Sequence, residues 1–353
     1  MPVAIITGSA GLVGSACARL FAAEGFDVVG IDNDMRAVFF GPEASTAPNR
    51  LDLERTVPRY RHHDFDVRDK EAVGRLFAEH AGSITAVVHA AAQPSHDWAA
   101  RDVETDFEIN ARATLTLLEA TRRHCPEAAF VFMSTNKVYG DTPNRLPLVE
   151  HATRWEIAED HPFFAHGIDE SMSVDATTHS LFGASKLAAD GFVQEYGRYF
   201  GLKTACFRAG CITGPAHAGT HLHGFLSYLV RCAVAGTDYA IVGHKGKQVR
   251  DNLHADDLAS MCLSYCRAPR AAEVYNVGGG RHANCSVREA IAAVEDIIGT
   301  AMKTHDVLAA RKGDHVWYVS DTRKFRAHYP EFRQRYDLNA ILSDICTAVG
   351  KSA

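Results

Sequence analysis

A glycine-rich turn after the first apolar segment constrains the fold of this chain more than any other feature. Residues 3–7 are mostly apolar and β-branched, which predicts a buried strand. Gly8, Gly11 and Gly14 come next, and apolar residues then recur at helical spacing until Gly25. Glycines at this spacing let the backbone come close to a ligand, and the first N–H groups of the helix favour a diphosphate. The turn therefore predicts a strand–turn–helix unit that binds a dinucleotide.

A carboxylate at the end of the second predicted strand, residues 28–32, narrows the choice of dinucleotide. Asp32 can accept hydrogen bonds from the hydroxyls of an adenosine ribose, and it would repel a 2′-phosphate. Asn33 follows it, where an arginine would suit the phosphate. The pattern therefore favours NAD over NADP.

Short apolar runs alternate with amphipathic stretches through the first half of the chain, as in βαβ units on a parallel sheet. Further strands are predicted at 84–89, 129–134 and 203–207, and helices at 70–80, 107–124 and 182–200. The predicted fold class is α/β, a doubly wound parallel sheet of Rossmann type with a smaller α/β cap. We expect residues 1–210 to form the NAD-binding core, with return segments near 250–278, and residues 211–353 to form mainly the substrate-binding cap.

Composition excludes several classes of protein. The chain has 353 residues, of which 46% are hydrophobic and 23% charged, so neither a disordered chain nor an integral membrane protein fits. The net charge of -6 argues against a nucleic-acid partner. The nine cysteines show neither disulfide nor zinc spacing, and we expect no metal site, although histidines recur at 217, 221 and 223. We read no signal peptide, and we expect a cytoplasmic protein.

An ordered series of motifs over nearly the whole chain points to one superfamily. The series comprises Thr-Gly-Ser-Ala-Gly-Leu-Val-Gly at 7–14, Asp-Phe-Asp-Val at 64–67, His-Ala-Ala-Ala-Gln at 89–93, Met-Ser-Thr-Asn-Lys-Val-Tyr-Gly at 133–140, Val-Arg-Asp-Asn-Leu-His at 249–254, Tyr-Asn-Val-Gly at 275–278 and Arg-Lys-Gly-Asp at 311–314. In these motifs the chain resembles the extended short-chain dehydrogenase/reductase superfamily, the nucleotide-sugar epimerases and dehydratases.

The resemblance implies that NAD is the cofactor, with Asp66 as the residue that takes the adenine amine. The cofactor-binding residues it implies are Gly8, Gly11, Leu12, Val13, Asp32, Asn33, Asp66, Val67, Ala90, Ala91, Gln93, Asn110, Ser134 and Lys186.

The superfamily's catalytic pair, Tyr-x-x-x-Lys on one helix face, is incomplete in this chain. The matching segment has Phe182 and Lys186, so the lysine is present and the tyrosine is not. A phenyl ring cannot carry the proton that the phenol would exchange with a sugar hydroxyl. The resemblance implies three catalytic positions: Thr135 orients the hydroxyl, residue 182 exchanges its proton, and Lys186 tunes both and holds the nicotinamide ribose.

Three explanations of Phe182 remain open. The chain is an inactive, engineered Tyr-to-Phe form, or a natural homologue that recruits another group, or a non-catalytic binder. Tyr139 and His179 are the candidate substitutes, although Tyr139 belongs to a motif in which its ring usually packs.

The residues after Thr135 discriminate between reaction types. Dehydratases of the superfamily carry Thr-Asp-Glu at this point, whereas this chain has Thr135-Asn136-Lys137, which disfavours dehydration. Segments 134–141, 167–171 and 246–251 resemble the CDP-paratose 2-epimerases, also called CDP-tyvelose epimerases. That resemblance implies transient oxidation of a CDP-sugar, at C2, to a keto-sugar. The alternatives are a UDP-hexose or UDP-uronate 4-epimerase and a non-catalytic NAD- and nucleotide-sugar-binding protein.

The resemblance also implies the substrate contacts and the assembly. Arg250 and Arg311 look like the pair that binds the substrate's two phosphates, and Asp251 and Asp314 would orient them. The implied substrate-binding residues are Asn136, Lys137, Cys211, Arg250 and Arg311. A homodimer is expected through helices 107–124 and 182–200, while neither a nucleic-acid nor a membrane partner is expected.

Overall fold

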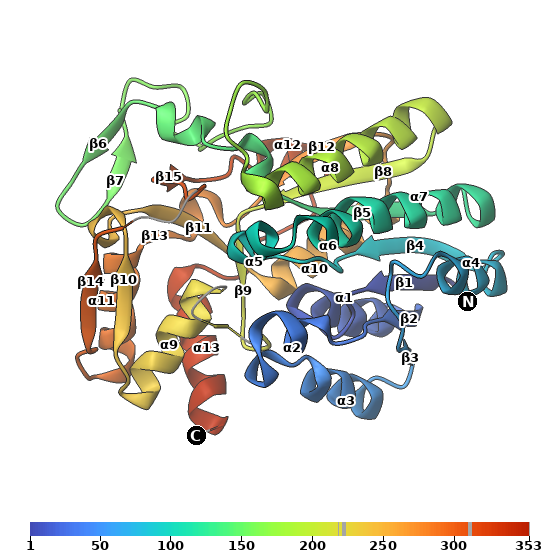
Figure 1. Cartoon of the computed structure of the whole chain (residues 1–353), viewed down its shortest axis with the longest axis horizontal. Coiled ribbons are helices and arrows are strands. Elements are labelled where there is room, and N and C mark those ends of the chain that lie inside the picture. Colours follow the sequence, from blue (N-terminus) through green and yellow to red (C-terminus); the bar gives the residue numbers. More distant parts are fainter. Residues whose placement is uncertain (218, 221–223, 310–312, 353) are drawn as a thin grey trace.

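The structure is a computed structural model that describes residues 1–217, 219–220, 224–309 and 313–352. Its centre is a parallel sheet of seven strands (Figure 1). In spatial order these are β12 (Glu273–Val277), β8 (Lys203–Ala209), β5 (Ala129–Thr135), β4 (Ile84–His89), β1 (Val3–Thr7), β2 (Asp27–Ile31) and β3 (Tyr60–His63). The predicted doubly wound α/β fold is therefore confirmed.

Helices cover both faces of this sheet, because successive residues of each strand point to opposite faces. On β1, Ala4 and Ile6 pack in one core cluster, whereas Val3 and Ile5 pack in the other. The helices of the first cluster are α1 (Leu12–Ala23), α3 (Ala47–Thr56), α10 (Ala255–Arg267) and α12 (Arg323–His328). Those of the second are α4 (Lys70–Glu79), α7 (Ala113–His124) and α8 (Ser180–Phe200).

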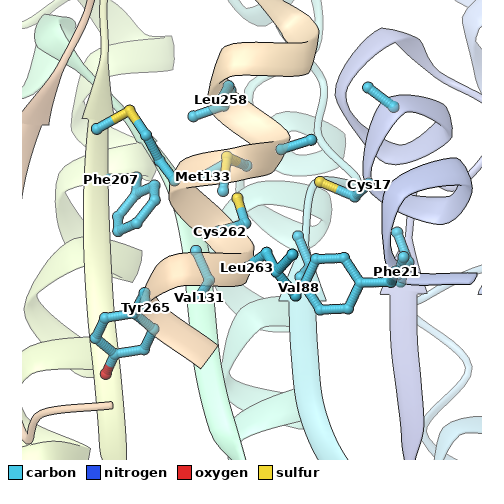
Figure 2. Packing of buried hydrophobic residues seen from close by; sticks show 14 of the residues in the cluster. Cys17, Phe21, Val88, Val131, Met133, Phe207, Leu258, Cys262, Leu263 and Tyr265 are labelled. Atoms are coloured by element: carbon cyan, nitrogen blue, oxygen red, sulfur yellow. The ribbon is translucent and has the colours of Figure 1, made fainter. Parts of the chain in front are cut away.

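Helix α10 brings chain from beyond residue 250 back onto the core. It packs against α1, with Cys262 facing Cys17 and Leu258 lying near Met133 of β5 (Figure 2). Strand β12 then pairs with β8 at the edge of the sheet, from Glu273 opposite Ala205 onward. The cysteines at this contact are thus buried among apolar side chains.

The predicted helix 107–124 is interrupted, which is the main difference from the sequence-based elements. The structure has α6 (Val103–Phe107), a π-helical segment η2 (Glu108–Arg112) and only then α7. The widened turn contains Asn110, whose side chain bonds the backbone of Gln93 on a separate loop. Such π segments commonly accompany a local functional requirement.

The remaining elements form a cap that lies together on one side of the molecule (left in Figure 1). Its strands are β9 (Cys211–Thr213), β11 (Val249–His254), β13 (Asn284–Ser286) and β15 (Trp317–Tyr318) in one sheet, and β10 (Tyr239–Val242) with β14 (Thr304–Val307) in another. Its helices are α9 (Phe225–Ala235), α11 (Val287–Ile298) and α13 (Leu338–Ser352). Two short helices outside the cap, α2 (Met35–Phe40) and α5 (His96–Arg101), lie in the first half of the chain.

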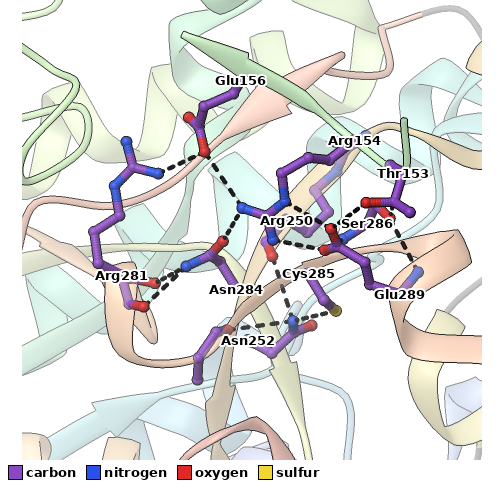
Figure 3. A network of polar contacts seen from close by, with 12 residues as sticks. Thr153, Arg154, Glu156, Arg250, Asn252, Arg281, Asn284, Cys285, Ser286 and Glu289 are labelled. Atoms are coloured by element: carbon purple, nitrogen blue, oxygen red, sulfur yellow. Dashed lines mark hydrogen bonds and ion pairs between the residues drawn. The ribbon is translucent and has the colours of Figure 1, made fainter. Parts of the chain in front are cut away.

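A small hairpin, β6 (Leu148–Glu150) with β7 (Trp155–Ile157), is fastened to the cap by ion pairs (Figure 3). Arg154 pairs with Glu289 of α11 at 2.6 Å, and Glu156 pairs with Arg281 at 2.8 Å. Half-buried networks of several charges are worth more than isolated surface pairs. The hairpin therefore belongs structurally to the cap, although it lies within the first half of the chain.

No helix in the described part of the chain is long and apolar enough to cross a membrane.

A buried ion pair joins β8 to α8 beneath the sheet's carboxyl edge. Arg208 donates two hydrogen bonds to Asp190, at 2.9 and 3.1 Å, and Ser134 donates a third at 2.6 Å. The side chains of Arg208 and Asp190 are 7% and 0% exposed. Because both charges have left water, neither tolerates the loss of its partner.

We predict that Asp190→Ala lowers the free energy of unfolding by about 3–5 kcal/mol, since it leaves a buried guanidinium unpaired. Urea unfolding followed by circular dichroism measures this loss. The matched control is Glu195→Ala on the same helix, whose partner Arg198 is half exposed; it should cost about 1 kcal/mol or less. Equal losses in the two variants would contradict the prediction.

Candidate active site

A cavity of about 560 Å³ lies where the carboxyl ends of the parallel strands face the cap. This edge is where open α/β sheets bind their ligands. The β1–α1 turn and the ends of β2, β4 and β5 form its core side, and β9, β10 and β11 contribute the cap side. One continuous cavity thus reaches from the glycine turn to the cap.

The glycine turn forms the floor of the cavity and has no room for side chains. Gly8 has a φ of +65°, and a Cβ there would lie 2.7 Å from the backbone nitrogen of Ala91. A Cβ on Gly14 would lie 2.0 Å from the carbonyl oxygen of Gly8. Gly11 is the N-cap of α1, and it has no side chain that could bond the first N–H groups of the helix. Because the first residues of α1 line the cavity, these N–H groups are available to a ligand there. This arrangement fits a bound diphosphate.

The predicted ribose and adenine contacts lie further along the same wall. Asp32 accepts hydrogen bonds from the N–H groups of Ala10 (3.0 Å) and Asp34 (2.9 Å), one on each carboxylate oxygen. Burial raises the pKa of this carboxyl group. Asp66 accepts from Asn33 at 3.1 Å, which links the two predicted contacts. Asp32, Asn33, Asp66 and Val67 all line the cavity.

Lys186 contributes a buried ammonium to the cavity wall. Its residue is 3% exposed, and Nζ lies 4.1 Å from the centre of the Phe132 ring. Within the described part of the chain, no side chain or carbonyl accepts a hydrogen bond from it. Burial lowers its pKa to about 7, against the opposing charge of Asp106. A buried cation in this position fits a cofactor hydroxyl as its acceptor.

Phe182 and Thr135 line the cavity beside Lys186. Phe182 lies one helical turn before the lysine and is 6% exposed. Thr135 ends β5, and its hydroxyl accepts a hydrogen bond from the N–H of Lys137 at 3.2 Å. Ala90, Ala91 and Ser134 lie on the same wall. The predicted catalytic positions are therefore gathered at one place, without a phenol among them.

Neither predicted substitute for the phenol lines the cavity. Tyr139 is buried between Arg208 and Asn276, to whose side-chain oxygen it donates at 2.8 Å. Burial raises its pKa to about 12. His179 precedes α8 but is absent from the described cavity wall. Both residues are therefore unsuited to proton exchange with a ligand in the cavity.

Charged side chains gather at the cap end of the cavity. Arg250 donates to Asp314 at 2.5 Å, and Lys137 donates to the carbonyl of Gly313 at 2.9 Å. Although burial acts to raise it, the two cations hold the pKa of Asp314 far below its usual range. Burial lowers the pKa of Lys137 to about 8. Asn136 and Cys211 complete this part of the wall.

Asp251 does not orient Arg250, contrary to the sequence-based expectation. Its Oδ2 accepts hydrogen bonds from the backbone N–H groups of Gly280 and Ser320, because the carboxylate is turned into the cap. Arg311, the second predicted clamp residue, lies outside the described residues, as do His221 and His223. In the described part of the chain no His, Cys, Asp or Glu side chains group as a metal site would require.

Gln93 and Asn110 are not among the described residues that line the cavity, and their predicted contact with the cofactor stays a prediction. Both are fully buried, and they form a lock within the protein. The Asn110 side chain bonds both the N–H and the carbonyl of Gln93. The Gln93 amide in turn donates to Asp106 at 2.7 Å and to the carbonyl of Ser95 at 2.9 Å. The lock fixes the loop that follows β4.

The residue that this loop carries into the cavity, His96, was missed by the sequence analysis. It lines the wall beside Phe182, with 5.0 Å between ring centres. Its position shortly after the end of β4, at the ligand-binding edge of the sheet, was the available signal. Aromatic residues of the cap, Phe225, Tyr228 and Tyr239, were missed as well.

Comparisons with known proteins agree with this geometry. The model of the NAD dependent epimerase/dehydratase family matches residues 4–278. CDP-paratose 2-epimerase of Salmonella typhi is 31% identical over 327 residues, which cover 91% of each chain. dTDP-glucose 4,6-dehydratase 1 of Escherichia coli (strain K12) is 29% identical over 285 residues, covering 78% of this chain and 71% of that one.

Among solved structures, UDP-glucose 4-epimerase of Thermus thermophilus in complex with NAD superposes with a TM-score of 0.79. It is 25% identical, and the match covers 100% of both chains. With the glycine turn, the carboxylate after β2 and the buried lysine at one cavity, the chain belongs to the NAD-dependent epimerase/dehydratase family, and its cofactor is NAD.

Proposed function

We propose that this chain is a nucleotide-sugar epimerase that inverts one carbon of a CDP-sugar, C2 of CDP-paratose or CDP-tyvelose, through a keto-sugar. The observation that carries the proposal is Thr135-Asn136-Lys137 on the cavity wall, an epimerase-like segment without the carboxylates of a dehydratase. The 31% identity to a CDP-paratose 2-epimerase supports the choice of sugar and base.

NAD, when bound, accepts a hydride from the sugar carbon and returns it to the other face of the ring. The glycine turn would bind its diphosphate, Asp32 its adenosine ribose, and Lys186 the ribose next to the reacting end. Thr135 would hold the sugar hydroxyl. These groups are held by strand ends and helices of one rigid sheet, so they are preorganised before the substrate arrives.

Asp314, a carboxylate at the cap end of the cavity, cannot replace the missing acid of a dehydratase. Asp314 pairs with Arg250 and lies 3.8 Å from Lys137, which keeps it ionised. An ionised carboxylate has no proton to give to a leaving hydroxyl. This is a second argument for epimerisation over dehydration.

The cap end would bind the diphosphate of the substrate. Arg250 and Lys137 carry two positive charges against the one negative charge of Asp314, so the cluster has net positive charge for a dianion. Asn136 and Cys211 would contact the sugar beside it. Arg311 remains a predicted second clamp residue.

Two alternatives each have one supporting observation. The fold match to a UDP-glucose 4-epimerase favours a UDP-hexose or UDP-uronate 4-epimerase, which needs only a different ring carbon facing the cofactor. Phe182 favours a non-catalytic NAD- and nucleotide-sugar-binding protein. The intact Lys186 and Thr135 count against loss of function.

We further propose a homodimer that forms through α7 and α8. Phe192, Tyr199 and Phe200 on α8 are 43%, 82% and 51% exposed, which is unusual for large apolar side chains on one helix. Leu118 of α7 and Tyr196 of α8 are not part of this face, because they pack in the core. The exposed apolar face described here is thus formed by residues of α8.

We predict that the protein inverts C2 of CDP-paratose, as measured by proton NMR, and acts much more slowly on UDP-glucose and UDP-glucuronate. Thr135→Val, which keeps the shape of the side chain and removes its hydroxyl, should lower kcat by about a hundredfold or more, because an oriented hydrogen bond to the reacting oxygen is lost.

The control in that experiment is NAD content, which Thr135→Val should leave unchanged. Turnover of the UDP-sugars alone would support the 4-epimerase. Retention of NAD with no turnover of any sugar, by the protein or by its Phe182→Tyr form, would instead support the binding protein.

We also predict a pH-dependent effect of Lys186 on the stability of the nucleotide-free protein. Its pKa is about 7 when folded and near 10.5 when unfolded, so between these values the unfolded chain binds a proton that the folded one does not. Stability from this group therefore rises with pH, by up to about 1.4 kcal/mol per unit. The Lys186→Met variant lacks this dependence on pH. Its free energy of unfolding should exceed that of the unmodified protein, and the difference should be largest at pH 7 and shrink toward pH 10.

Urea unfolding of both proteins at pH 7, 8 and 9 measures the gap. Lys203→Met, which removes a surface lysine paired with Glu127, serves as the control and should run parallel to the unmodified protein. A gap between Lys186→Met and the protein that stays constant with pH would contradict the shifted pKa.

A further inference from the structure

We propose that His96 exchanges the proton of the sugar hydroxyl, in the role that a tyrosine at position 182 would have. The inference rests on the proposed function, since it concerns the proton that accompanies hydride transfer. It makes Phe182 a natural residue of an active enzyme, whose missing phenol is replaced by an imidazole from another segment.

The first observation is where the imidazole lies. His96 lines the same cavity as Thr135, Phe182 and Lys186. Its ring meets that of Phe182 edge-on, with 5.0 Å between centres and 61° between planes. The two side chains therefore occupy adjoining parts of the cavity wall. Histidine is also the side chain whose ordinary pKa lies nearest neutrality.

The second observation is how the ring is held. His96 Nδ1 lies 2.9 Å from Oγ of Ser180, which also accepts the N–H of Gly183 at 3.2 Å. A hydroxyl oxygen can accept a hydrogen bond from Nδ1–H, and Nδ1 carries its proton both in the neutral imidazole with a bare Nε2 and in the imidazolium. Ser180 therefore suits the imidazole in both protonation states, and the proposal assigns the exchange to Nε2.

Ser180 itself is held in an unusual backbone conformation. Its φ is +61°, in the left-handed region that non-glycine residues seldom adopt. Such strain persists where surrounding contacts enforce it, and it concentrates at functional sites. Here it places the hydroxyl between the start of α8 and the imidazole.

The third observation is that buried side chains fix the loop that carries His96. Gln93 accepts the N–H of Ser95 at 2.6 Å, and Ser95 caps α5, which begins at His96. Asn110 and Asp106 hold Gln93 from the helix side. On the other side Gly313 lies against the pair, since a Cβ there would come within 3.5 Å of the His96 ring nitrogen. A side chain held this firmly meets the positional demand of proton transfer.

The imidazole balances the proton, and the cofactor balances the hydride. In the oxidation the O–H bond breaks and its proton forms a bond with Nε2 of the neutral imidazole, while the carbon gives its hydride to NAD. In the reduction the imidazolium returns that proton to the carbonyl oxygen as the hydride comes back to the carbon. No other acid or base is consumed over the cycle.

The test uses His96→Asn, because an asparagine amide can still bond Ser180 where Nδ1 was but has nothing in place of Nε2. We expect kcat with CDP-paratose to fall by about 10²–10⁴, the usual contribution of general acid–base catalysis. NAD affinity measured by calorimetry should stay within about twofold of the unmodified protein, the range ordinary for a residue that does not bind the ligand. The matched control is His179→Asn, one residue before Ser180 and off the cavity wall, which should retain its activity.

A second variant separates catalysis from a structural role. Phe182→Tyr in the His96→Asn background should restore at least tenfold of the lost kcat, because the phenol then carries the proton. The substitutions would thus be non-additive. A structural defect in the loop would not be repaired by a hydroxyl on α8.

A spectroscopic readout does not depend on turnover. In protein labelled with ¹⁵N-histidine, the His96 signal, assigned by its loss in His96→Asn, should shift on addition of CDP-paratose and not with CDP alone.

The outcomes distinguish the two proposals. Activity in His96→Asn equal to that of the protein overturns the role of His96 and leaves the epimerase standing. Activity that appears only with Phe182→Tyr overturns it as well. No turnover by any form overturns the proposed function and this inference with it.

Discussion

The close approach of backbone to backbone at the start of α1 is the constraint on which the site depends. Gly8 touches the chain that follows β4, and Gly14 touches Gly8, at distances that any Cβ would prevent. These contacts fix where the first N–H groups of α1 lie relative to the sheet, and they hold the loop after β4 beside them. Asp32, Thr135 and Lys186 can then face one cavity, because each stands on an element aligned by the same sheet.

Much of the fold and of the candidate site could be predicted from local sequence pattern. Strands β1 and β4 have the predicted bounds. The glycine turn, Asp32, Thr135 and Lys186 lie at the cavity, because the position of each follows from its own segment and from the carboxyl edge of the sheet. What it did not predict depends on contacts between segments. The Gln93 side chain bonds Asp106 inside the protein, and the π segment that contains Asn110 has no local signature. Asp251 is turned away by two N–H groups from distant parts of the cap.

Phe182 shows how far a motif on one helix determines chemistry. The motif describes a helix face, whereas the cavity wall at this point is built from β5, α8 and the start of α5. A phenyl ring preserves the packing of that wall and removes its hydroxyl. The proton carrier can therefore move to another segment without repacking the core, provided that segment is held as firmly as a helix. The buried amides of Gln93 and Asn110 supply that rigidity.

The return of β12 to the sheet has a consequence for synthesis of the chain on the ribosome. Until Val277 has emerged, β8 is an edge strand, with the N–H and carbonyl groups that will bond β12 open to any other strand. The Rossmann half thus cannot close before the first part of the cap, from β9 to β11, has been made. During that interval it carries the hazard of an unpaired hydrophobic edge, which ordinary N-to-C domain-by-domain folding would avoid.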